Sequence, residues 1–170
     1  MVALPHRQFE CAGGLRGAHT GANPTDRGKA GVKHHVATDG QGTPFVVDVT
    51  PANVHDSQRL LPLIEAIPAV PGAVGAPRHR PARVCADKAY DARALRQELR
   101  RRKIIPEIAR RGTDDVPLGR TRWVIERTIA WYRQFRRLRV CYEKRPDIHA
   151  AFLDLATTLI TFRRWQSLFC

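Results

Sequence analysis

Two strand-like segments flank a short glycine turn in the first third of the chain, so the chain must build a β-sheet. The segments are His34–Asp39 and Pro44–Thr50, and the turn between them is Gly40-Gln41-Gly42. A short glycine-containing turn between two extended segments is typical of a β-hairpin. The second segment contains the β-branched apolar run FVVDV, which is typical of a buried strand. We therefore predict a sheet that contains this hairpin.

Strand-like and helix-like patterns alternate along the rest of the chain. Each helix-like segment has apolar residues at helical spacing, and each strand-like segment is a short apolar run. This order predicts an α/β fold, a mixed β-sheet flanked by helices. The predicted elements are a helix that Asp56 caps and that runs to Ile67, a strand Arg83–Ala86, a helix Ala92–Lys103 capped by Asp91, a strand Ile104–Ala109, and helices from Arg122 to about Tyr142 and from Ile148 to Trp165.

The first part of the chain shows no such pattern. Residues 1–31 are rich in glycine, histidine, arginine and small polar residues, and they have no apolar period. A segment without an apolar face to bury cannot offset the entropy cost of ordering its backbone. We therefore predict an irregular N-terminal segment over residues 1–16 and a single domain over residues 17–170.

The chain is strongly basic. Its 170 residues include 29 lysines and arginines and 16 aspartates and glutamates, which gives a formal net charge of +13. Residues 86–170 hold 20 of the basic residues and 10 of the acidic ones. An excess of this size indicates a polyanionic partner, most often nucleic acid, and places the binding surface mainly in the second half of the chain.

Several other classes of protein are excluded. No apolar run approaches the roughly 20 residues of a membrane-spanning helix, and the N-terminus lacks a secretory signal pattern. The four cysteines are isolated, which argues against a zinc ribbon and suits a reducing compartment. We expect a soluble cytoplasmic protein, associated with the nucleoid and not with a membrane.

The histidines and glycines form no convincing metal or phosphate site. His34 and His35 are adjacent on a predicted strand, so their side chains point to opposite faces and cannot bind one metal ion there. His149, like the other isolated histidines, lacks a partner at metal-ligand spacing and is expected at the surface. The Gly28-Lys29 pair lacks the other residues that a Walker phosphate loop requires.

Asp87 is one of two carboxylates that are candidates for chemistry. It directly follows the predicted strand that ends at Ala86. Loops at the C-terminal ends of strands build binding sites in mixed α/β folds. Because Asp91 is better placed to cap the helix that follows, Asp87 is available for another role.

Glu126 is the other candidate. It shares the polar side of its predicted helix with Arg122, Arg133 and Arg137. The residues alone fit two interpretations, a solvated face with an Arg122–Glu126 ion pair or a functional carboxylate among cations. The basic run FRRLR, which adds Arg136, is likewise either a solvated helix face or a phosphate-binding surface.

Taken together, these segments resemble the DDE-class transposases of bacterial insertion sequences. The matching stretches are, in the family's order, GAHTGANPTDRGKAGVKHHVATDGQGTPFVVDVTPANVHDSQRLLPLIEAIP, ADKAYD, RWVIERTIAWYRQFRRLRVCYEKR and a helix ending in ITFRRW. They extend from about Gly17 to Trp165. The resemblance implies an RNase H-like fold, a mixed five-stranded sheet with helices on its faces. It also implies three acidic residues that hold two divalent cations, Mg²⁺ or Mn²⁺.

The resemblance assigns roles residue by residue. Asp87, in ADKAYD, matches the second acidic residue, and Glu126, in RWVIERTIAWYR, matches the glutamate. Both would be catalytic metal ligands. Arg122 and Arg133 match basic positions around that glutamate, and Arg136 and Arg137 of the basic run FRRLR extend the surface that they form. The DNA-binding residues expected on these grounds are Arg122, Arg133, Arg136 and Arg137.

Two positions depart from the family's pattern. The tyrosine expected three residues before Arg122 is Gly119. The first catalytic aspartate, which ends an apolar strand shortly before GAHTG, is missing, because that window reads HRQFECAGGLR and Glu10 is its only carboxylate. The first strand is therefore expected to be missing or degenerate. Two explanations remain open, a degenerate remnant or a downstream reading frame joined to an upstream one by frameshifting.

The leading hypothesis is a transposase catalytic domain that cleaves and joins DNA by two-metal phosphodiester chemistry and is impaired as an isolated chain. The alternative is a non-catalytic basic DNA-binding remnant, or a modulator of a full-length transposase. The expected partners are DNA, at element ends and target, and a second copy of the chain or an upstream-frame transposase. The leading hypothesis requires Asp87 and Glu126 to lie within several ångströms of each other.

Overall fold

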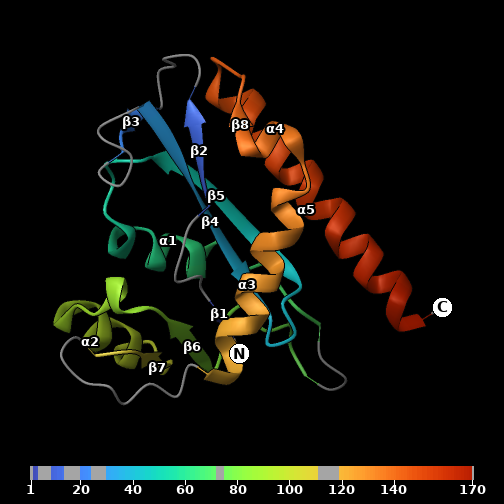
Figure 1. The fold of residues 1–170 in the computed structure, drawn as a ribbon. Helices are drawn as coiled ribbons and strands as arrows, with labels where there is room; N and C mark the ends of the chain where they lie inside the picture. The colour runs from blue at the N-terminus through green and yellow to red at the C-terminus, as the bar shows by residue number, and fades with distance from the viewer. Residues whose placement is uncertain are drawn as a thin grey trace.

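The computed structural model describes residues 2–3, 9–13, 20–23, 30–71, 75–110 and 119–169. Within them, one mixed β-sheet is covered by helices on both faces, which confirms the predicted α/β architecture (Figure 1). The strands are β1 Val2–Ala3, β2 Phe9–Gly13, β3 Gly21–Ala22, β4 Ala30–Thr38, β5 Pro44–Pro51, β6 Arg83–Ala86, β7 Ile105–Ile108 and β8 Val140–Cys141. The helices are the 3₁₀ turns η1 Asp56–Gln58 and η2 Lys88–Tyr90, and α1 Leu60–Glu65, α2 Arg93–Arg101, α3 Gly119–Arg133, α4 Arg136–Arg139 and α5 Pro146–Phe169.

The predicted hairpin is confirmed as β4 and β5. The two strands pair in antiparallel register along nearly their whole length. In the turn between them, the Asp39 carboxylate accepts hydrogen bonds from the backbone amides of Gln41 and Thr43, both at 2.8 Å. Gly42 completes the turn with a φ of +85°, a conformation that favours glycine.

β1 and β2 both pair with the second edge of β4. β5 occupies the first edge of β4 from Val32 to Thr38. Along the other edge, Ala3 lies opposite Thr38 and Phe9 lies opposite His34. β1 also pairs in parallel with β6, which in turn pairs in parallel with β7. The order across the sheet is therefore β5–β4–β1–β6–β7, with β2 beside the other part of β4 and the short β8 beside β2.

The prediction of an irregular segment over residues 1–16 was wrong for the parts that the structure describes. Val2–Ala3 and Phe9–Gly13 are strands, so the first strand of the sheet is present in two short pieces. The sequences of these two segments show no strand pattern. Their extended conformation is supported by hydrogen bonds to the edge of β4. Residues 4–8 and 14–16 lie outside the described residues.

Side-chain alternation along the strands divides the core into two layers. Ala37 and Val84 belong to a cluster with residues of α1 and α2, on what we call the α1–α2 face. Val36 and Cys85 belong to a cluster with residues of α3, α4 and α5, on the α3–α5 face. Because successive residues of a strand point to opposite faces, each strand contributes to both layers. Figure 1 shows the two groups of helices on opposite sides of the sheet.

The long helix predicted as far as about Tyr142 is two helices. α3 and α4 are separated by Gln134 and Phe135, whose backbone amides donate to carbonyls three residues earlier. The break turns the chain so that Tyr132 and Leu138 are both fully buried in the same core layer. Apolar residues continue through the break, so periodicity alone did not reveal it. None of the helices in the described part of the chain is long and apolar enough to cross a membrane.

Two predicted helix caps were wrong. Asp56 pairs instead with Lys33, whose Nζ lies 3.1 Å from the carboxylate, and His55 occupies the N-cap of η1. Asp91 pairs with the Nε of Arg96 at 2.7 Å, and α2 begins without a side-chain cap. Lys33 reaches Asp56 from a strand 23 residues away, whereas Arg96 lies only five residues after Asp91, in α2 itself.

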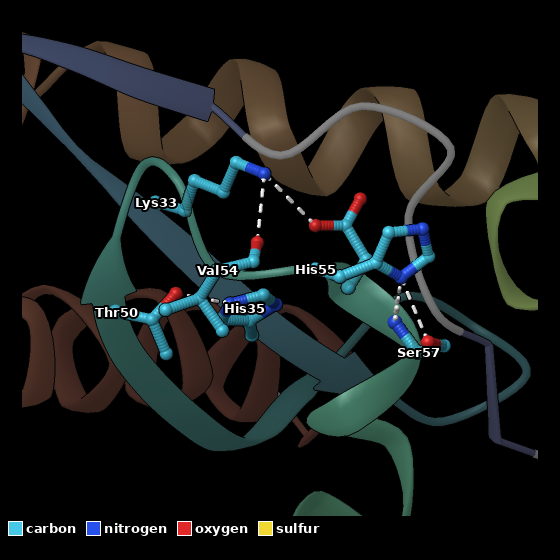
Figure 2. Close-up of polar contacts among 7 residues, drawn as sticks. Lys33, His35, Thr50, Val54, His55 and Ser57 are labelled. Carbon is cyan, nitrogen blue, oxygen red and sulfur yellow. Dashed lines mark hydrogen bonds and ion pairs between the residues drawn. The ribbon is translucent and has the colours of Figure 1, made fainter. Parts of the chain in front are cut away.

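A buried polar cluster joins β4 to the loop before α1, as Figure 2 shows. Lys33 Nζ donates a hydrogen bond to the backbone carbonyl of Val54 at 3.0 Å in addition to its pairing with Asp56. On the same face of β4, the Nε2 of His35 hydrogen-bonds the Thr50 hydroxyl at 2.8 Å. The cluster holds the loop that contains η1 on the sheet, and η1 in turn contacts η2.

Replacing Gly42 with alanine should destabilise the fold. Besides the strained φ, a Cβ at this position would lie 2.9 Å from both Thr128 Oγ1 and Val124 Cγ1 on α3. We expect the free energy of unfolding to fall by about 2–4 kcal/mol, measured by urea denaturation. Gly75→Ala is the control, because its φ is +97° but its Cβ would meet no described atom within 4 Å. It should lose only about 1–2 kcal/mol, and equal losses would contradict the α3 contact.

Replacing His35 with glutamine should make stability less sensitive to acid. Burial lowers the pKa of His35 from 6.5 to about 4, against the opposing effect of nearby carboxylates. As the pH falls from 6.5 to 4, the unfolded state takes up this proton first, and the wild type should lose up to about 3 kcal/mol of stability. Urea denaturation at pH 7 and pH 4 should show the stability gap between wild type and variant shrinking by that amount. A gap independent of pH would contradict the assignment.

Candidate active site

Asp87 lies where β6 ends. The observed bounds of β6 match the predicted strand Arg83–Ala86, and Asp87 follows it with an extended backbone. Its side chain is only 7% exposed, and its carboxylate accepts a hydrogen bond from the backbone amide of Ala89 at 3.4 Å. Asp87 is thus the N-cap of η2. The expectation that Asp91 would leave Asp87 without a capping role was therefore wrong.

Near the end of β6, the side chain of Cys85 points to the face of the sheet that α3 covers. Cys85 packs in one hydrophobic cluster with Ile125 and Ile129 of α3. Because side chains alternate along extended backbone, we expect the side chain of Asp87, two residues after Cys85, on the α3–α5 face as well.

Glu126 belongs to helix α3, which packs on this face of the sheet. The helix is attached to the β4–β5 turn by Thr128, whose hydroxyl donates to the backbone carbonyl of Gly42 at 2.7 Å. Glu126 is exposed, and its neighbour in sequence, Ile125, packs with Cys85. Both candidate carboxylates therefore come from elements that contact each other through the core.

Glu107 on β7 is another carboxylate of this face, but it is engaged within the sheet. It lies opposite Cys85, whose Sγ donates to its carboxylate at 2.9 Å, and it pairs with Arg83 at 3.1 Å. Burial and the bond to Glu107 raise the pKa of the Cys85 thiol to about 12, so the thiol remains a protonated donor. Among the described residues, no group of three or more histidine, cysteine, aspartate or glutamate side chains is arranged to hold a metal ion.

Glu10, the one carboxylate in the first 16 residues, has a side chain that lies outside the described part of the structure. Its backbone belongs to β2 and is opposite Lys33. β1 lies beside β6, which ends one residue before Asp87, and neither Val2 nor Ala3 carries a carboxylate. The described side chains therefore supply no third acidic group from the N-terminal strands.

The predicted DNA-binding arginines are at the surface wherever their side chains are described. Arg133, Arg136 and Arg137 are exposed, and Arg137 also forms an ion pair with Glu143. Arg122 belongs to α3, but its side chain lies outside the described residues.

A stack of tryptophan and arginine side chains, which the sequence analysis missed, runs along α3 to α5. The guanidinium of Arg127 lies 4.5 Å from the ring centroid of Trp123 and 5.0 Å from that of Trp131. The guanidinium of Arg164 lies 5.7 Å from the Trp131 ring, beside a groove of about 340 Å³ that Arg163 also lines. The spacing of four residues on α3 was the available signal, because such residues share a helix face. We call these four residues, 123, 127, 131 and 164, the Trp–Arg stack.

His34 and His149 form a buried pair, which corrects the expectation that His149 is a surface residue. Their Nε2 atoms lie 2.6 Å apart, and the side chains are 0% and 2% exposed. Only tertiary packing of α5 on β4 brings them together. His35 contacts Thr50 on the opposite face, which confirms that these adjacent histidines point to opposite faces and cannot bind the same metal ion.

Comparison with known proteins identifies the family. The family model described as "Transposase DDE domain" matches residues 5–160. A Burkholderia cepacia protein named "Putative transposase for insertion sequence element IS402" is 51% identical over 150 residues, which cover 88% of this chain and 70% of the relative. The "Transposase for insertion sequence element IS1106" of Neisseria meningitidis serogroup B is 31% identical over 126 residues.

That second match covers 67% of this chain and 40% of the relative, so the chain corresponds to part of each of these longer proteins. No solved structure shows a significant match. The family model nevertheless covers most of the chain, including β6 with Asp87 and α3 with Glu126. On this basis the protein belongs to the DDE transposase domain family of bacterial insertion sequences.

Proposed function

We propose that this chain forms an RNase H-like catalytic domain of an insertion-sequence transposase, which cleaves and joins DNA strands during transposition. The order β5–β4–β1–β6–β7 within the described sheet of eight strands supports this proposal, because the family resemblance implies a mixed sheet of five strands with helices on its faces. Strand β1 is antiparallel to β4 and parallel to β6, so the sheet changes from antiparallel to parallel pairing at β1.

The observation that carries the proposal is the placement of Asp87 and Glu126. β6, which ends one residue before Asp87, packs through Cys85 against α3, the helix that contains Glu126, although 39 positions separate the two residues in the sequence. We assign both as catalytic carboxylates. Asp87 is positioned by its bond to Ala89 and by the contact of η2 with η1, which the Lys33–Asp56 pair supports.

The donor chemistry of these two residues fits a hard divalent cation. Proteins of the DDE family use divalent metal ions, and carboxylate oxygens are the ligands that Mg²⁺ and Mn²⁺ prefer. A bound cation would activate the attacking oxygen and stabilise the leaving oxygen of a phosphodiester. Since the sequence window that should hold the family's first aspartate contains none, we expect weaker metal binding than in a complete three-carboxylate site.

The cationic surface beside α3 would hold the DNA. Arg133, Arg136 and Arg137 extend into solvent from α3 and α4, where they can contact phosphates without sequence preference. The Trp–Arg stack adds aromatic faces next to guanidinium groups, a combination on which unpaired bases stack. Trp123 in this stack is 53% exposed and therefore accessible to a ligand.

A second function is favoured by the sequence window of the family's first aspartate, which holds no aspartate. A non-catalytic DNA-binding remnant, or a modulator of a full-length transposase, would need the basic surface but not the carboxylates. The departure from the family's pattern at the first aspartate fits this alternative as well as it fits an impaired enzyme. The two functions differ in whether Asp87 and Glu126 matter for what the chain does to DNA.

Asp87→Asn and Glu126→Gln should each abolish metal-dependent nicking of supercoiled DNA. Each variant removes a negative charge that would hold the cation but keeps the size of the side chain. We expect the nicking rate in Mn²⁺ to fall by at least about 100-fold, measured by agarose-gel conversion of supercoiled to open-circular plasmid.

Glu65→Gln is the matched control, because it removes one exposed carboxylate on α1, on the opposite face of the sheet, and should leave nicking unchanged. Circular dichroism should show that all three variants fold. If the wild type does not nick DNA in Mg²⁺ or Mn²⁺, and neither site variant changes DNA binding, the non-catalytic function is the correct one.

Replacing Arg133, Arg136 and Arg137 with glutamine should weaken DNA binding for all sequences. Each lost phosphate contact should flatten the slope of log affinity against log salt by about one unit. Fluorescence anisotropy with two unrelated duplexes over a salt series measures both effects. The matched triple change of Arg93, Arg100 and Arg101 on α2 removes the same charge from the opposite face and should change the slope less. Equal slopes for the two triple variants would mean that the α3–α4 arginines are merely solvated.

A further inference from the structure

Strand β5 forms an edge of the sheet. Within the described part of the chain it pairs only with β4. The hydrogen bond from the Ala52 amide to the Gly31 carbonyl shows which residues of β5 turn their backbone groups toward β4, because hydrogen-bonded pairs alternate along an antiparallel ladder. Every second residue back from Ala52 faces β4. Val47 and Val49 therefore turn their backbone groups away from β4, toward the outer edge.

Other parts of the domain close the two ends of this outer edge. At one end, the Pro44 carbonyl accepts a hydrogen bond from the Thr161 hydroxyl of α5 at 3.0 Å. At the other end, the Pro51 carbonyl accepts one from the Val54 amide at 3.0 Å. Only the section between these two prolines is left for further pairing.

The middle of the edge keeps backbone groups that have no hydrogen-bond partner among the residues that the structure describes. The amide of Val49 donates to the Asp48 carboxylate at 2.9 Å. This leaves the amide and the carbonyl of Val47 and the carbonyl of Val49. Both valines are partly exposed. A strand edge with unpaired backbone groups is a template on which another polypeptide can add a strand.

A groove of about 320 Å³ lies beside this section, between β5 and the first half of α5. Its lining includes Val47 and Val49 of β5 and Ala150 and Leu153 of α5. The side chains of an added strand would alternate between the two faces of the sheet. Those on the α3–α5 face would enter this groove, because α5 packs on that face. The groove therefore has the position that the side chains of a strand paired with β5 require.

Three aspartates line the groove, and no lysine or arginine among the described residues does so. Asp147 and Asp154 are seven residues apart on α5, so they share one side of the helix at a separation of about 10 Å along its axis. Asp48 and Asp147 pair with Arg59 and Arg145, but both pairs are exposed, and such pairs contribute little. The Asp154 carboxylate is exposed and has no ion-pair partner within the described residues.

This charge selects the chemistry of the occupant. The chain as a whole has a net charge of +13, yet the groove presents carboxylates, which repel the phosphates of nucleic acid. A lysine or arginine fits better, because its apolar stem can lie on the valines of β5 while its charged end reaches an aspartate. The edge requires an extended backbone, and the groove requires basic side chains.

We propose that the open section of β5 binds an extended, basic segment of a partner protein, which adds a strand to the sheet. The backbone of this segment pairs with Val47 and Val49. Its lysine or arginine side chains on the α3–α5 face contact Asp147 and Asp154. The closed ends of the edge limit the pairing to the middle of β5. The proposal does not rest on the proposed catalytic function.

A labelled peptide of about ten residues, in which lysine and valine alternate, is the probe for this edge. Fluorescence anisotropy with the full chain, free of nucleic acid, should show saturable binding. The same peptide with glutamate in place of lysine should bind at least about tenfold more weakly, because the groove is acidic. A wild-type chain that does not bind the lysine peptide, or that binds both peptides equally, would overturn the proposal.

Backbone pairing has its own test. In an added strand, the amides of alternate residues point to β5, so N-methylation of every lysine and N-methylation of every valine should differ in effect. One of the two modified peptides should bind at least about tenfold more weakly than the other. Equal affinities would mean a contact of charges without strand pairing, and would overturn the proposal.

Variants of the chain locate the binding site. Asp154→Lys should raise the dissociation constant of the lysine peptide by at least about tenfold, because it places a like charge in the groove. Glu65→Lys is the matched control, since it reverses one exposed carboxylate on α1, on the opposite face of the sheet. It should leave the dissociation constant unchanged, and equal effects of the two variants would count against the groove.

Val47→Pro removes an amide from the open section and should abolish binding, since proline is tolerated in edge strands where the amide is unpaired. Circular dichroism of each variant should show that a loss of binding does not come from unfolding. Sedimentation velocity tests the other occupant, a second copy of the chain. Self-association that Val47→Pro removes would assign the edge to that second copy and overturn the proposal.

Discussion

Strand β4 is hydrogen-bonded along both of its edges, and the relative placement of the candidate carboxylates depends on this pairing. β5 takes one edge, and the N-terminal strands β1 and β2 share the other. β6 is linked to the hairpin through β1, which pairs with both. Asp87 follows β6, whereas the helix that carries Glu126 is attached to the β4–β5 turn through Gly42. The short strand Val2–Ala3 therefore joins the two halves of the sheet from which the candidate site is assembled.

The alternation of side chains along β4 separates structural polar groups from the candidate site. Lys33 and His35 point to the α1–α2 face, where Lys33 is paired with Asp56 and His35 with Thr50. These contacts hold η1, and through it η2, without entering the face on which α3 lies. His34 points to the α3–α5 face and is closed off by His149. A one-residue shift in register would move each side chain of β4 to the other face of the sheet. The pairing of β4 with β5 therefore decides which polar side chains are buried on each face.

Local patterns predicted the elements well where the stabilising partners lie within the element. β6 was predicted to the residue, and the hairpin was recognised from its glycine turn because the turn chemistry is local. The predicted cap at Asp56 failed because Lys33, from a distant strand, holds this aspartate, whereas Asp91 pairs with Arg96 of the next helix and leaves that helix without a side-chain cap. β1 and β2 were missed because their hydrogen-bond partners belong to β4 and β6. The Trp–Arg stack had a visible spacing on α3, but its last member is on α5.

The sequence by itself determined the family, the α/β class, the basic second half and the identities of Asp87 and Glu126 as candidates. These follow from residue types and spacings, which can be read without any knowledge of tertiary contacts. Only the tertiary structure decided that Asp87 caps η2, that His149 is buried against His34, and that one apolar face of α5 is left at the surface. The physical reason is that burial and hydrogen-bond partners are set by packing between distant segments. An apolar helix face has the same sequence pattern whether it is buried in the core or exposed to solvent, and only the fold shows which of the two applies.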